Sequence, residues 1–412
     1  MDQTKSLLIL GGNQETIRLV TAAQKMGLVV HVTDDNPSSP AKKVADFCHN
    51  VDGLDVQGIV ELALKIKADG VLVGVADILV SSYSKVCEIL GLPCYSSLEL
   101  SRSLSEKDLF KKQLSKVGLK GIPEYSFEGP KNYPLMLKPA DNGGGVGMFR
   151  CDSELQFHNN YGKALAASRK KVVLIERYIE ADDLGIYFVF EDGKAFLSCV
   201  YDRFTTKEQH GFSNVCVGGT YPSRFAQDYY QNVHDKLLLM FENLGIKYGV
   251  LMLSAFKCSD EFYFYDTGFR LQGEAPDILI KDLNSYDQCE KLIEFALQGK
   301  YNPPSLSSCS DPFFGGIKAA TVWFLLKQGV IDSISGIDLI KARESCIHIS
   351  QRLFEGDVIL EHMVGNEKQV FARVYLKADS DDALRSEIQI VQETIVVLDK
   401  NQNNLVLRGM FQ

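Results

Sequence analysis

The sequence predicts an α/β protein whose first part is a doubly wound parallel sheet and whose later parts are α+β, with hairpin strands between helices. Continuous apolar strands alternate with amphipathic helices over residues 1–95, a pattern typical of parallel strands buried on both faces. Further on, short turns join successive strands, which indicates antiparallel hairpins. The chain has 412 residues, 45% apolar and 24% charged, as expected for a globular protein of two or three domains.

The elements of the first part follow from apolar runs and turn residues. Strands are predicted at Ser6–Leu10, Val29–Thr33 and 70–75, and helices at 15–26 and 56–67. A Gly-Gly pair follows the first strand, but the G-x-G-x-x-G spacing of a dinucleotide site is absent. We therefore interpret this pair as a tight turn and predict no NAD site.

Helices and hairpins continue through the rest of the chain. A segment rich in Pro and Ser over 302–308 marks a boundary between a middle and a last part. The predicted elements are helices over 229–244 and 380–391, and strands at 250–256, 261–266, 370–376 and 394–398.

Charge and composition exclude several classes of protein. The 44 Lys and Arg residues against 53 Asp and Glu give a net charge of -9, which disfavours nucleic-acid binding. No apolar run is long enough to span a membrane, and no signal peptide is recognisable at the start. The ten cysteines form no C-x-x-C pair, so we expect free thiols and a cytoplasmic protein without a zinc site.

A lysine and a glycine-rich loop form the first candidate for chemistry. The apolar strand that ends at Lys138 is followed by glycines at 143, 144, 145 and 147. A lysine can hold one phosphate as a point charge, while glycine backbone N–H groups close over others. No Gly-Lys-Ser/Thr follows, so this is not a Walker A loop. The alternative is a flexible hairpin tip with an exposed lysine.

Two further segments fit a nucleotide site. A strand over 172–176 ends in Glu176, which could accept a hydrogen bond from an adenine amino group, and Asp183, seven residues later, could hold ribose hydroxyls. Upstream, Lys107 opens a helix that could reach the same phosphates. Exposed acidic residues at a strand end and a solvated helix lysine are the competing interpretations.

A carboxylate and an arginine follow the predicted strand at 261–266. Asp266 and Arg270 could bind a magnesium ion and a phosphoryl oxygen. A surface ion pair between the two residues is the alternative.

In this order and spacing, the segments resemble the ATP-grasp superfamily, in the branch around carbamoyl-phosphate synthetase, biotin carboxylase and the purine-pathway carboxylate–amine ligases. The resemblance covers nearly the whole chain and extends to the strand-and-turn patterns at 329–336 and 352–358. It implies a pre-ATP-grasp domain over 1–95, an ATP-grasp domain over 96–300 with a mobile lid over about 118–183, and a biotin-carboxylase-like mixed region over 301–412.

The resemblance also implies residue roles. Lys107 and Lys138 would contact ATP phosphates, with Arg270 near the transferred phosphoryl group, so that Lys138 and Arg270 are the catalytic candidates. The adenine and ribose would meet Glu176, Tyr178, Ile179 and Asp183. The lid loop would comprise Gly143, Gly144, Gly145, Val146 and Gly147, and the Mg²⁺ or Mn²⁺ ligand would be Asp266.

The metal ligands depart from the family pattern. That pattern has a Glu or Gln, a Glu twelve residues later and an Asn two residues beyond it. Here the positions are Ser254, Asp266 and Gly268. Asp266 alone can suffice, because Mg²⁺ is often held by one or two carboxylates together with phosphates and waters.

Two hypotheses therefore stay open. The first is an ATP-dependent ligase that joins a carboxylate to an amine, or to a thiol, through an acyl phosphate; the second is a nucleotide-binding regulator or scaffold with a degraded metal site. Small-molecule substrates are expected, with no nucleic-acid or membrane partner, and the resemblance implies a possible homodimer. Acceptor specificity would come from residues such as Asn13, Glu15, Asp77 and Gln272, each of which could equally be a helix cap or a surface group.

Overall fold

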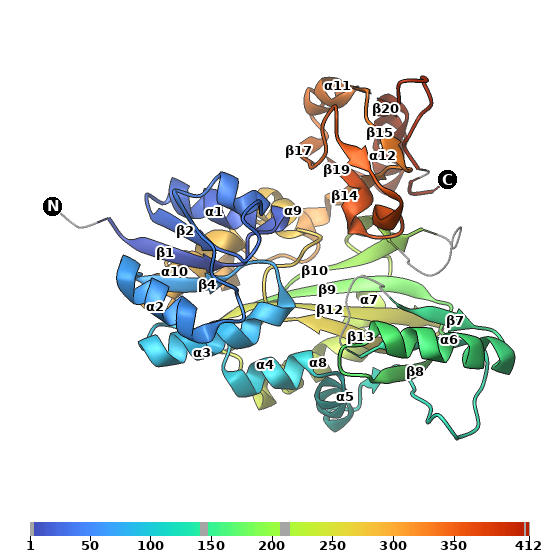
Figure 1. Cartoon of the computed structure of the whole chain (residues 1–412), viewed down its shortest axis with the longest axis horizontal. Helices are drawn as coiled ribbons and strands as arrows, with labels where there is room; N and C mark the ends of the chain where they lie inside the picture. Colours follow the sequence, from blue (N-terminus) through green and yellow to red (C-terminus); the bar gives the residue numbers. More distant parts are fainter. Residues whose placement is uncertain (1–3, 141–146, 207–214, 408, 412) are drawn as a thin grey trace.

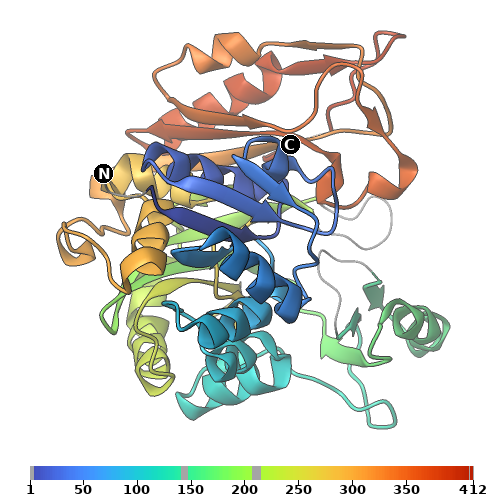
Figure 2. The ribbon, with the colours of Figure 1, turned by 60° about the vertical axis from the view of Figure 1, so that its left-hand side comes forward.

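The protein is a mixed α/β molecule built around three main sheets. A computed structural model describes residues 4–140, 147–206, 215–407 and 409–411. An N-terminal parallel sheet, a long central sheet and a small three-stranded sheet are arranged around the middle of the molecule (Figures 1 and 2). In the described parts of the chain, no helix has the length and apolar content needed to cross a membrane. The predicted fold class is confirmed.

The N-terminal sheet has the order β3-β2-β1-β4 and is parallel throughout. Its central strand β1 is fully buried from Leu7 to Leu10, which explains its continuous apolar sequence. The predicted bounds of β1 and β2 are confirmed, whereas the strand predicted at 70–75 ends at Val73. The elements are β1 (Ser6–Leu10), η1 (Gln14–Thr16), α1 (Ile17–Lys25), β2 (Val29–Thr33), η2 (Pro40–Lys43), β3 (Phe47–His49), α2 (Val56–Ile66), β4 (Gly70–Val73), η3 (Asp77–Leu79) and α3 (Val80–Leu90).

The central sheet has nine strands in the order β17-β19-β14-β11-β10-β9-β12-β13-β5. Neighbouring strands are antiparallel, except for the parallel pair β13 and β5. Strands on both sides of the boundary expected near 302–308 belong to this one sheet. Its strands are β5 (Lys120–Gly121), β9 (Asp182–Glu191), β10 (Lys194–Thr205), β11 (Cys216–Tyr221), β12 (Gly249–Cys258), β13 (Glu261–Gly268), β14 (Lys318–Leu325), β17 (Cys346–Gln351) and β19 (Val370–Ala378).

The small sheet has the order β7-β6-β8 and lies beside one end of the central sheet (Figure 1). One helix, α6, covers it, and the two form a separate small core around Leu137 and Phe157. The elements are β6 (Leu135–Pro139), β7 (Phe149–Cys151), α6 (Glu154–Ala167) and β8 (Val173–Arg177).

One predicted helix differs in its geometry. The segment expected as a regular helix over 229–244 has a π-helical turn, Tyr230–His234, in its first half. The wider turn brings the ring centroids of Tyr230 and His234 to 4.6 Å, and the His234 ring stacks on Phe188.

The remaining helices are α4 (Leu98–Ser105), α5 (Lys107–Lys116), α7 (Ala226–Tyr229), α8 (Asp235–Asn243), α9 (Asp277–Asn284), α10 (Gln288–Gln298), α11 (Ile337–Lys341) and α12 (Asp381–Thr394), with short turns η5 to η8 at Leu306–Ser308, Phe314–Gly316, Glu361–Met363 and Glu367–Gln369. The short strand pairs are β15 (Gly329–Val330) with β18 (Val358–Ile359), and β16 (Ser333–Ser335) with β20 (Val396–Leu398).

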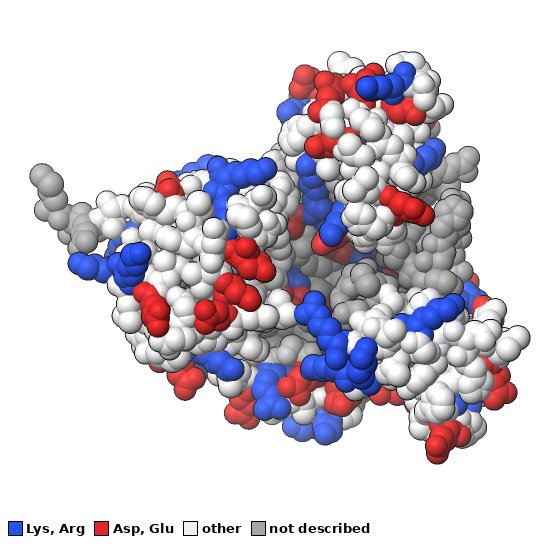
Figure 3. Space-filling view, in the orientation of Figure 1, with Lys and Arg blue, Asp and Glu red and all other residues white. Residues whose placement is uncertain are grey.

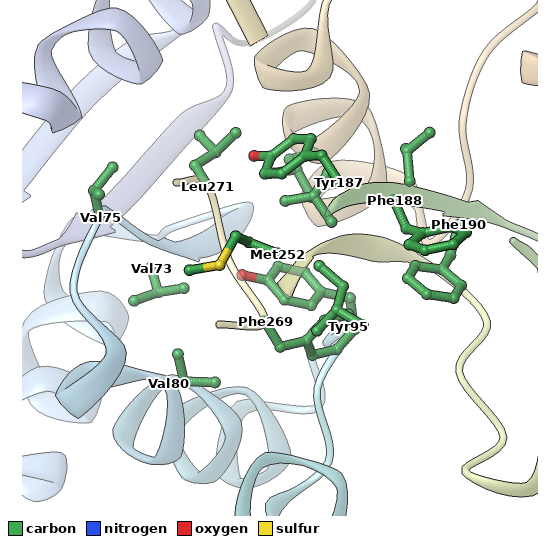
Figure 4. Close-up of a cluster of buried hydrophobic side chains, with 14 of the residues drawn as sticks. Val73, Val75, Val80, Tyr95, Tyr187, Phe188, Phe190, Met252, Phe269 and Leu271 are labelled. Atoms are coloured by element: carbon green, nitrogen blue, oxygen red, sulfur yellow. The ribbon is translucent and has the colours of Figure 1, made fainter. Parts of the chain in front are cut away.

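The N-terminal sheet and the central sheet share one hydrophobic core. Figure 4 shows Val73, the last residue of β4, and Val75 just after it in one buried cluster with Tyr95 and Phe269, whose rings meet edge to face at 5.2 Å. Helix α10, although late in the sequence, packs on α1 and β4. This shared core brings the segment after β4 next to the end of β13, and these are the places where Asp77 and Arg270 lie.

Candidate functional site

The first part of the site is a buried carboxylate with two lysines. Strand β8 places Glu176 at 2% exposure. Lys138 Nζ, from β6, lies 2.7 Å from its Oε2, and Lys111 Nζ, from α5, donates to its Oε1 at 3.1 Å. Burial alone would raise the pKa of Glu176, but the charges of Lys138 and Lys111 outweigh it and leave the pKa lowered. The ionised carboxylate thus fixes two ammonium groups at one point.

Lys107, the first residue of α5, adds a third positive charge. Burial lowers its pKa, and although Glu176 raises it, the neighbouring Lys138 lowers it further. The structure therefore brings together Lys107, Lys138 and Glu176, which the sequence analysis selected separately. Lys111 also pairs with Glu124, so the three lysines face two carboxylates, and the positive charge in excess suits the phosphates of a nucleotide.

Strand β13 carries the candidate metal ligand, Asp266. In the ladder with β12, Asp266 stands opposite Ser254. The side chain of Asp266 reaches solvent but is surrounded by protein, and this partial burial raises its pKa, with a further increase from the charge of Asp77 and an opposing effect of Lys107. Asp266 thus lies between the lysine cluster and the N-terminal part.

The other two positions of the expected metal set provide no strong ligand. The hydroxyl of Ser254 is directed to the sulfur of Met252 at 3.3 Å, and Gly268 has no side chain. Among the residues that the structure describes, no three or more His, Cys, Asp or Glu side chains converge as a metal centre would require. Carboxylate oxygens beside a cluster of lysines nevertheless fit Mg²⁺ bound with a nucleotide, because Mg²⁺ keeps several waters and takes few protein ligands.

Arg270, just after β13, is joined to the N-terminal part. Its guanidinium is buried, and its Nη2 pairs with a carboxylate oxygen of Asp77, while its Nη1 donates to the carbonyl oxygen of Leu271 at 2.7 Å. Its Nε is buried without a hydrogen-bond partner among the described residues. One donor of this arginine therefore remains unsatisfied in the described structure.

The predicted ribose ligand lies in a hydrogen-bonded network. Asp183 accepts hydrogen bonds from Tyr265 Oη at 2.7 Å and from Arg203 Nη1 at 2.8 Å. Arg203 Nε also donates to Glu274 at 2.6 Å. Burial raises the pKa of Asp183, and the charge of Arg203 opposes this. These contacts fix the carboxylate, and its ribose role stays a prediction.

The remaining nucleotide candidates lie around the small sheet. Tyr178 follows β8, donates its N–H to the carbonyl oxygen of Pro134 at 3.1 Å and has the guanidinium of Arg150 4.4 Å from its ring. Ile179 is half-buried beside it. Gly147 has φ +77. The predicted loop residues Gly143, Gly144 and Gly145 lie outside the described residues.

Sequence reasoning missed a cluster of arginines from the C-terminal part. Arg373 on β19 is 1% exposed, and its Nη1 donates to Glu15 Oε2 at 3.1 Å and to the carbonyl oxygen of Gly273. Arg352 pairs with the other oxygen of Glu15. The Nε and Nη2 of Arg373 have no hydrogen-bond partner within the described parts of the chain. The cluster thus offers buried donors to an anion.

Arg18 completes this cluster from the N-terminal side. Its Nε donates to Asp277 at 2.8 Å, and its Nη2 donates to the carbonyl oxygen of Gln272 at 2.7 Å. The guanidinium groups of Arg18, Arg352 and Arg373 face two carboxylates, Glu15 and Asp277, so one positive charge is in excess. A carboxylate or phosphate ligand would balance it.

The residues considered for acceptor specificity have different surroundings. Asn13 is a helix cap, because its side chain accepts from the N–H of Thr16 at 3.1 Å. Glu15 and Asp77 instead pair with arginines of other parts of the chain. Gln272 is buried and donates to Tyr201 Oη at 2.9 Å.

Arg373 could have been found from its context. It interrupts the apolar run of β19, Val370–Ala378, whose other residues are mostly buried. A charged residue within a buried part of a strand must be paired or bind a ligand, since burying an unpaired charge is costly. The partner, Glu15, lies 358 residues away, which no local spacing rule can detect.

Figure 3 shows that the molecule is hollowed where its N-terminal, C-terminal and small-sheet parts meet, with basic side chains at the rim. The segment from Asp266 to Gly273 connects the lysine and arginine clusters, because the charge of Lys107 acts on Asp266 and the carbonyl oxygen of Gly273 accepts a hydrogen bond from Arg373.

Comparisons with known proteins agree with this geometry. Residues 120–214 match the family described as D-ala D-ala ligase C-terminus. A formate-dependent phosphoribosylglycinamide formyltransferase of Sulfolobus acidocaldarius is 29% identical over 192 residues, 43% of this chain and 48% of that protein. A D-alanine–D-alanine ligase of Pseudothermotoga lettingae is 23% identical over 229 residues, 50% of this chain and 72% of that protein. The chain therefore spans about half of the first relative and more of the second.

Solved structures share the fold over almost the whole chain. The L-amino acid ligase from Bacillus licheniformis has a TM-score of 0.78 and 16% identity, covering 97% of this chain and 100% of that chain. Phosphoribosylglycinamide synthetase from Anaerococcus prevotii has a TM-score of 0.77 and 15% identity, with the same two coverages, 97% and 100%. The matched segment, the relatives and the shared fold thus all agree with the resemblance to the ATP-grasp superfamily.

Proposed function

We propose that the protein is an ATP-dependent ligase that activates a carboxylate as an acyl phosphate and joins it to an amine, or to a thiol, with release of ADP and phosphate. The observation that carries this proposal is the joining of two anion-binding clusters by one short segment. The lysines around Glu176 suit nucleotide phosphates, and Arg373, linked to them through residues 266–273, has buried donors for a carboxylate.

The relatives support this choice of reaction class. Two of them are named as a formyltransferase that depends on formate and as a D-alanine–D-alanine ligase, both of which handle carboxylates. The biotin carboxylase domain of 2-oxoglutarate carboxylase from Hydrogenobacter thermophilus is described as a dimer in complex with MgADP and bicarbonate. The ligands named for that domain support ATP, a divalent cation (Mg²⁺ or Mn²⁺) and a carboxylate as ligands of this protein. The dimer named there supports a homodimer as a further proposal.

In the first step, a carboxylate oxygen of the substrate attacks the γ-phosphorus of ATP and the bond to ADP breaks. Lys138 and Lys107 hold the phosphates, and Arg270 neutralises charge on the transferred phosphoryl group. Arg373 would orient the attacking carboxylate. Positioning and charge neutralisation provide most of the catalysis in phosphoryl transfer.

In the second step, the amine nitrogen attacks the acyl carbon, phosphate leaves and the amine loses a proton. The glycine loop after Lys138 would keep water from the acyl phosphate, which would otherwise hydrolyse. Magnesium, when bound with the nucleotide, supplies additional positive charge, and Asp266 would hold it.

Ser254 and Gly268 favour the second candidate function, a nucleotide-binding regulator without turnover, because neither residue gives a metal a strong ligand. Titration calorimetry with a non-hydrolysable ATP analogue separates the two, using Mg²⁺ or EDTA on the wild type and on Asp266→Ala. A ligase is expected to bind the analogue more weakly in EDTA and in Asp266→Ala. Equal affinity in all conditions favours the regulator, and absence of binding overturns both.

A further inference from the structure

The carboxylate of Asp77 lies beside Gly268, the position in the expected set of metal ligands that has no side chain. It begins the short helix η3 after β4, yet its carboxylate reaches across to β13. A Cβ placed on Gly268 would lie 2.9 Å from Asp77 Oδ1. The N-terminal part of the chain therefore fills, with a carboxylate, the space that a side chain at position 268 would occupy.

This carboxylate faces the same space as Asp266. Asp266 and Gly268 are two residues apart on β13, so their side-chain directions are on the same face of the strand. Asp77 Oδ2 is used by Arg270, whereas no described residue donates a hydrogen bond to its Oδ1. Asp77 is also 51% exposed, so a ligand can reach it.

We propose that Asp77 supplies the second carboxylate ligand of the divalent cation that accompanies the nucleotide, in place of the side chain that Gly268 lacks. Oδ1 takes the cation, and Oδ2 remains on Arg270. Two carboxylates with phosphates and waters complete the usual coordination of Mg²⁺. This inference rests on the proposed function, because the nucleotide supplies the remaining ligands.

Arg270 gives an independent indication that an anion binds beside this pair. It is 8% exposed, and its Nε is buried without a hydrogen-bond partner among the described residues. A phosphate oxygen would satisfy that donor. Asp77 thereby connects the cation to Arg270, the arginine that would meet the phosphate. Because Asp77 belongs to the N-terminal part, the site is complete only when that part is docked on the central sheet.

The alternative is that Asp77 only pairs with Arg270 and has no role toward a cation. Substitutions at 77 and 268 separate the two cases. Asp77→Asn keeps the size of the side chain but removes its charge. Gly268→Asn combined with Asp77→Ala removes the carboxylate and returns a side-chain oxygen to position 268, in the space that Asp77 leaves.

The experiment measures the affinity for Mn²⁺ from the electron paramagnetic resonance signal of the free ion, with the full chain and a non-hydrolysable ATP analogue. Asp77→Asn should weaken Mn²⁺ binding at least about tenfold, whereas Asp77→Ala/Gly268→Asn should recover most of the wild-type affinity. The control is Asp35→Asn, an exposed aspartate of the same N-terminal part. Analogue affinity in EDTA should be the same in all variants.

Unchanged Mn²⁺ affinity in Asp77→Asn, with normal analogue binding, overturns this inference and leaves the proposed function standing. Failure of the double variant to exceed Asp77→Ala alone also contradicts it, because position 268 would then have no part in the cation site. If the wild type binds no analogue with or without Mn²⁺, the proposed function falls, and this inference falls with it.

Discussion

At the scale of single residues, the site depends on charged side chains that lie close together and are partly buried. Lys107, Lys111 and Lys138 surround one buried carboxylate, Glu176. In the absence of a ligand these lysines repel one another, and burial adds to the cost of charging Lys107. A nucleotide would relieve that repulsion, because its phosphates are the anions that the cluster lacks.

Proton uptake by Lys107 tests whether nucleotide phosphates bind at the lysine cluster. Burial lowers the pKa of Lys107, with neighbouring lysines adding to the effect, so part of it is neutral at alkaline pH. Phosphates raise that pKa, and binding should therefore take up more protons at alkaline pH than at neutral pH. Calorimetry in buffers of different ionisation enthalpy measures this uptake. Lys107→Met should abolish it, while Lys112→Met, an exposed lysine of the same helix, should leave it unchanged. Equal uptake in Lys107→Met would show that another group titrates.

At the scale of elements, apolar continuity made the strands predictable. The bounds of β1 and β2 agree with the prediction because each is a short, mostly apolar run between turn residues. The π-helical turn at Tyr230–His234 could not be predicted, because helical periodicity does not reveal a one-residue widening that ring packing stabilises.

Gly147 has a left-handed backbone conformation just before β7. Its φ is +77, and an added Cβ would lie 2.5 Å from Ala167 Cβ. We expect Gly147→Ala to cost about 1–2 kcal/mol from the left-handed backbone, with a further cost from the clash. Denaturant unfolding and hydrogen exchange in α6 measure this cost.

Gly162 is the matched control for Gly147. It lies on α6 with no atom within 4 Å of an added Cβ. Gly162→Ala should be neutral or stabilise the protein by roughly 0.5–1 kcal/mol, because alanine is the better helix former. Equal effects of the two substitutions would contradict the account of Gly147.

At the scale of the whole molecule, ion pairs between distant parts of the chain assemble the site. Asp77 with Arg270 joins the N-terminal part to the central sheet, and Glu15 with Arg352 and Arg373 joins it to the C-terminal part. The sequence indicated each cluster's local members, such as Lys138 and Asp266. It could not indicate these pairs, since their spacing depends on the docking of separate sheets and not on local periodicity.

Glu15 should therefore be important for stability as well as for the site. Glu15→Gln leaves Arg352 and Arg373 close together without their shared carboxylate. We expect it to lower the free energy of unfolding by about 3 kcal/mol, the usual cost of removing one partner of a buried ion pair. Denaturant unfolding measures the change, with Glu99→Gln, an exposed residue of α4, as the control. A loss no greater than that of the control would show that the pairs contribute little.

Trapping the acyl phosphate tests the ligase directly. Hydroxylamine replaces the unknown amine, and a panel of carboxylates is screened with ATP and Mg²⁺ for hydroxamate and ADP. We predict that at least one carboxylate gives hydroxamate and ADP in equal amounts, and that Lys138→Met and Arg373→Met reduce both products together. If the protein binds the nucleotide but no carboxylate in a broad panel yields ADP or hydroxamate, the ligase assignment is contradicted and the nucleotide-binding regulator takes its place.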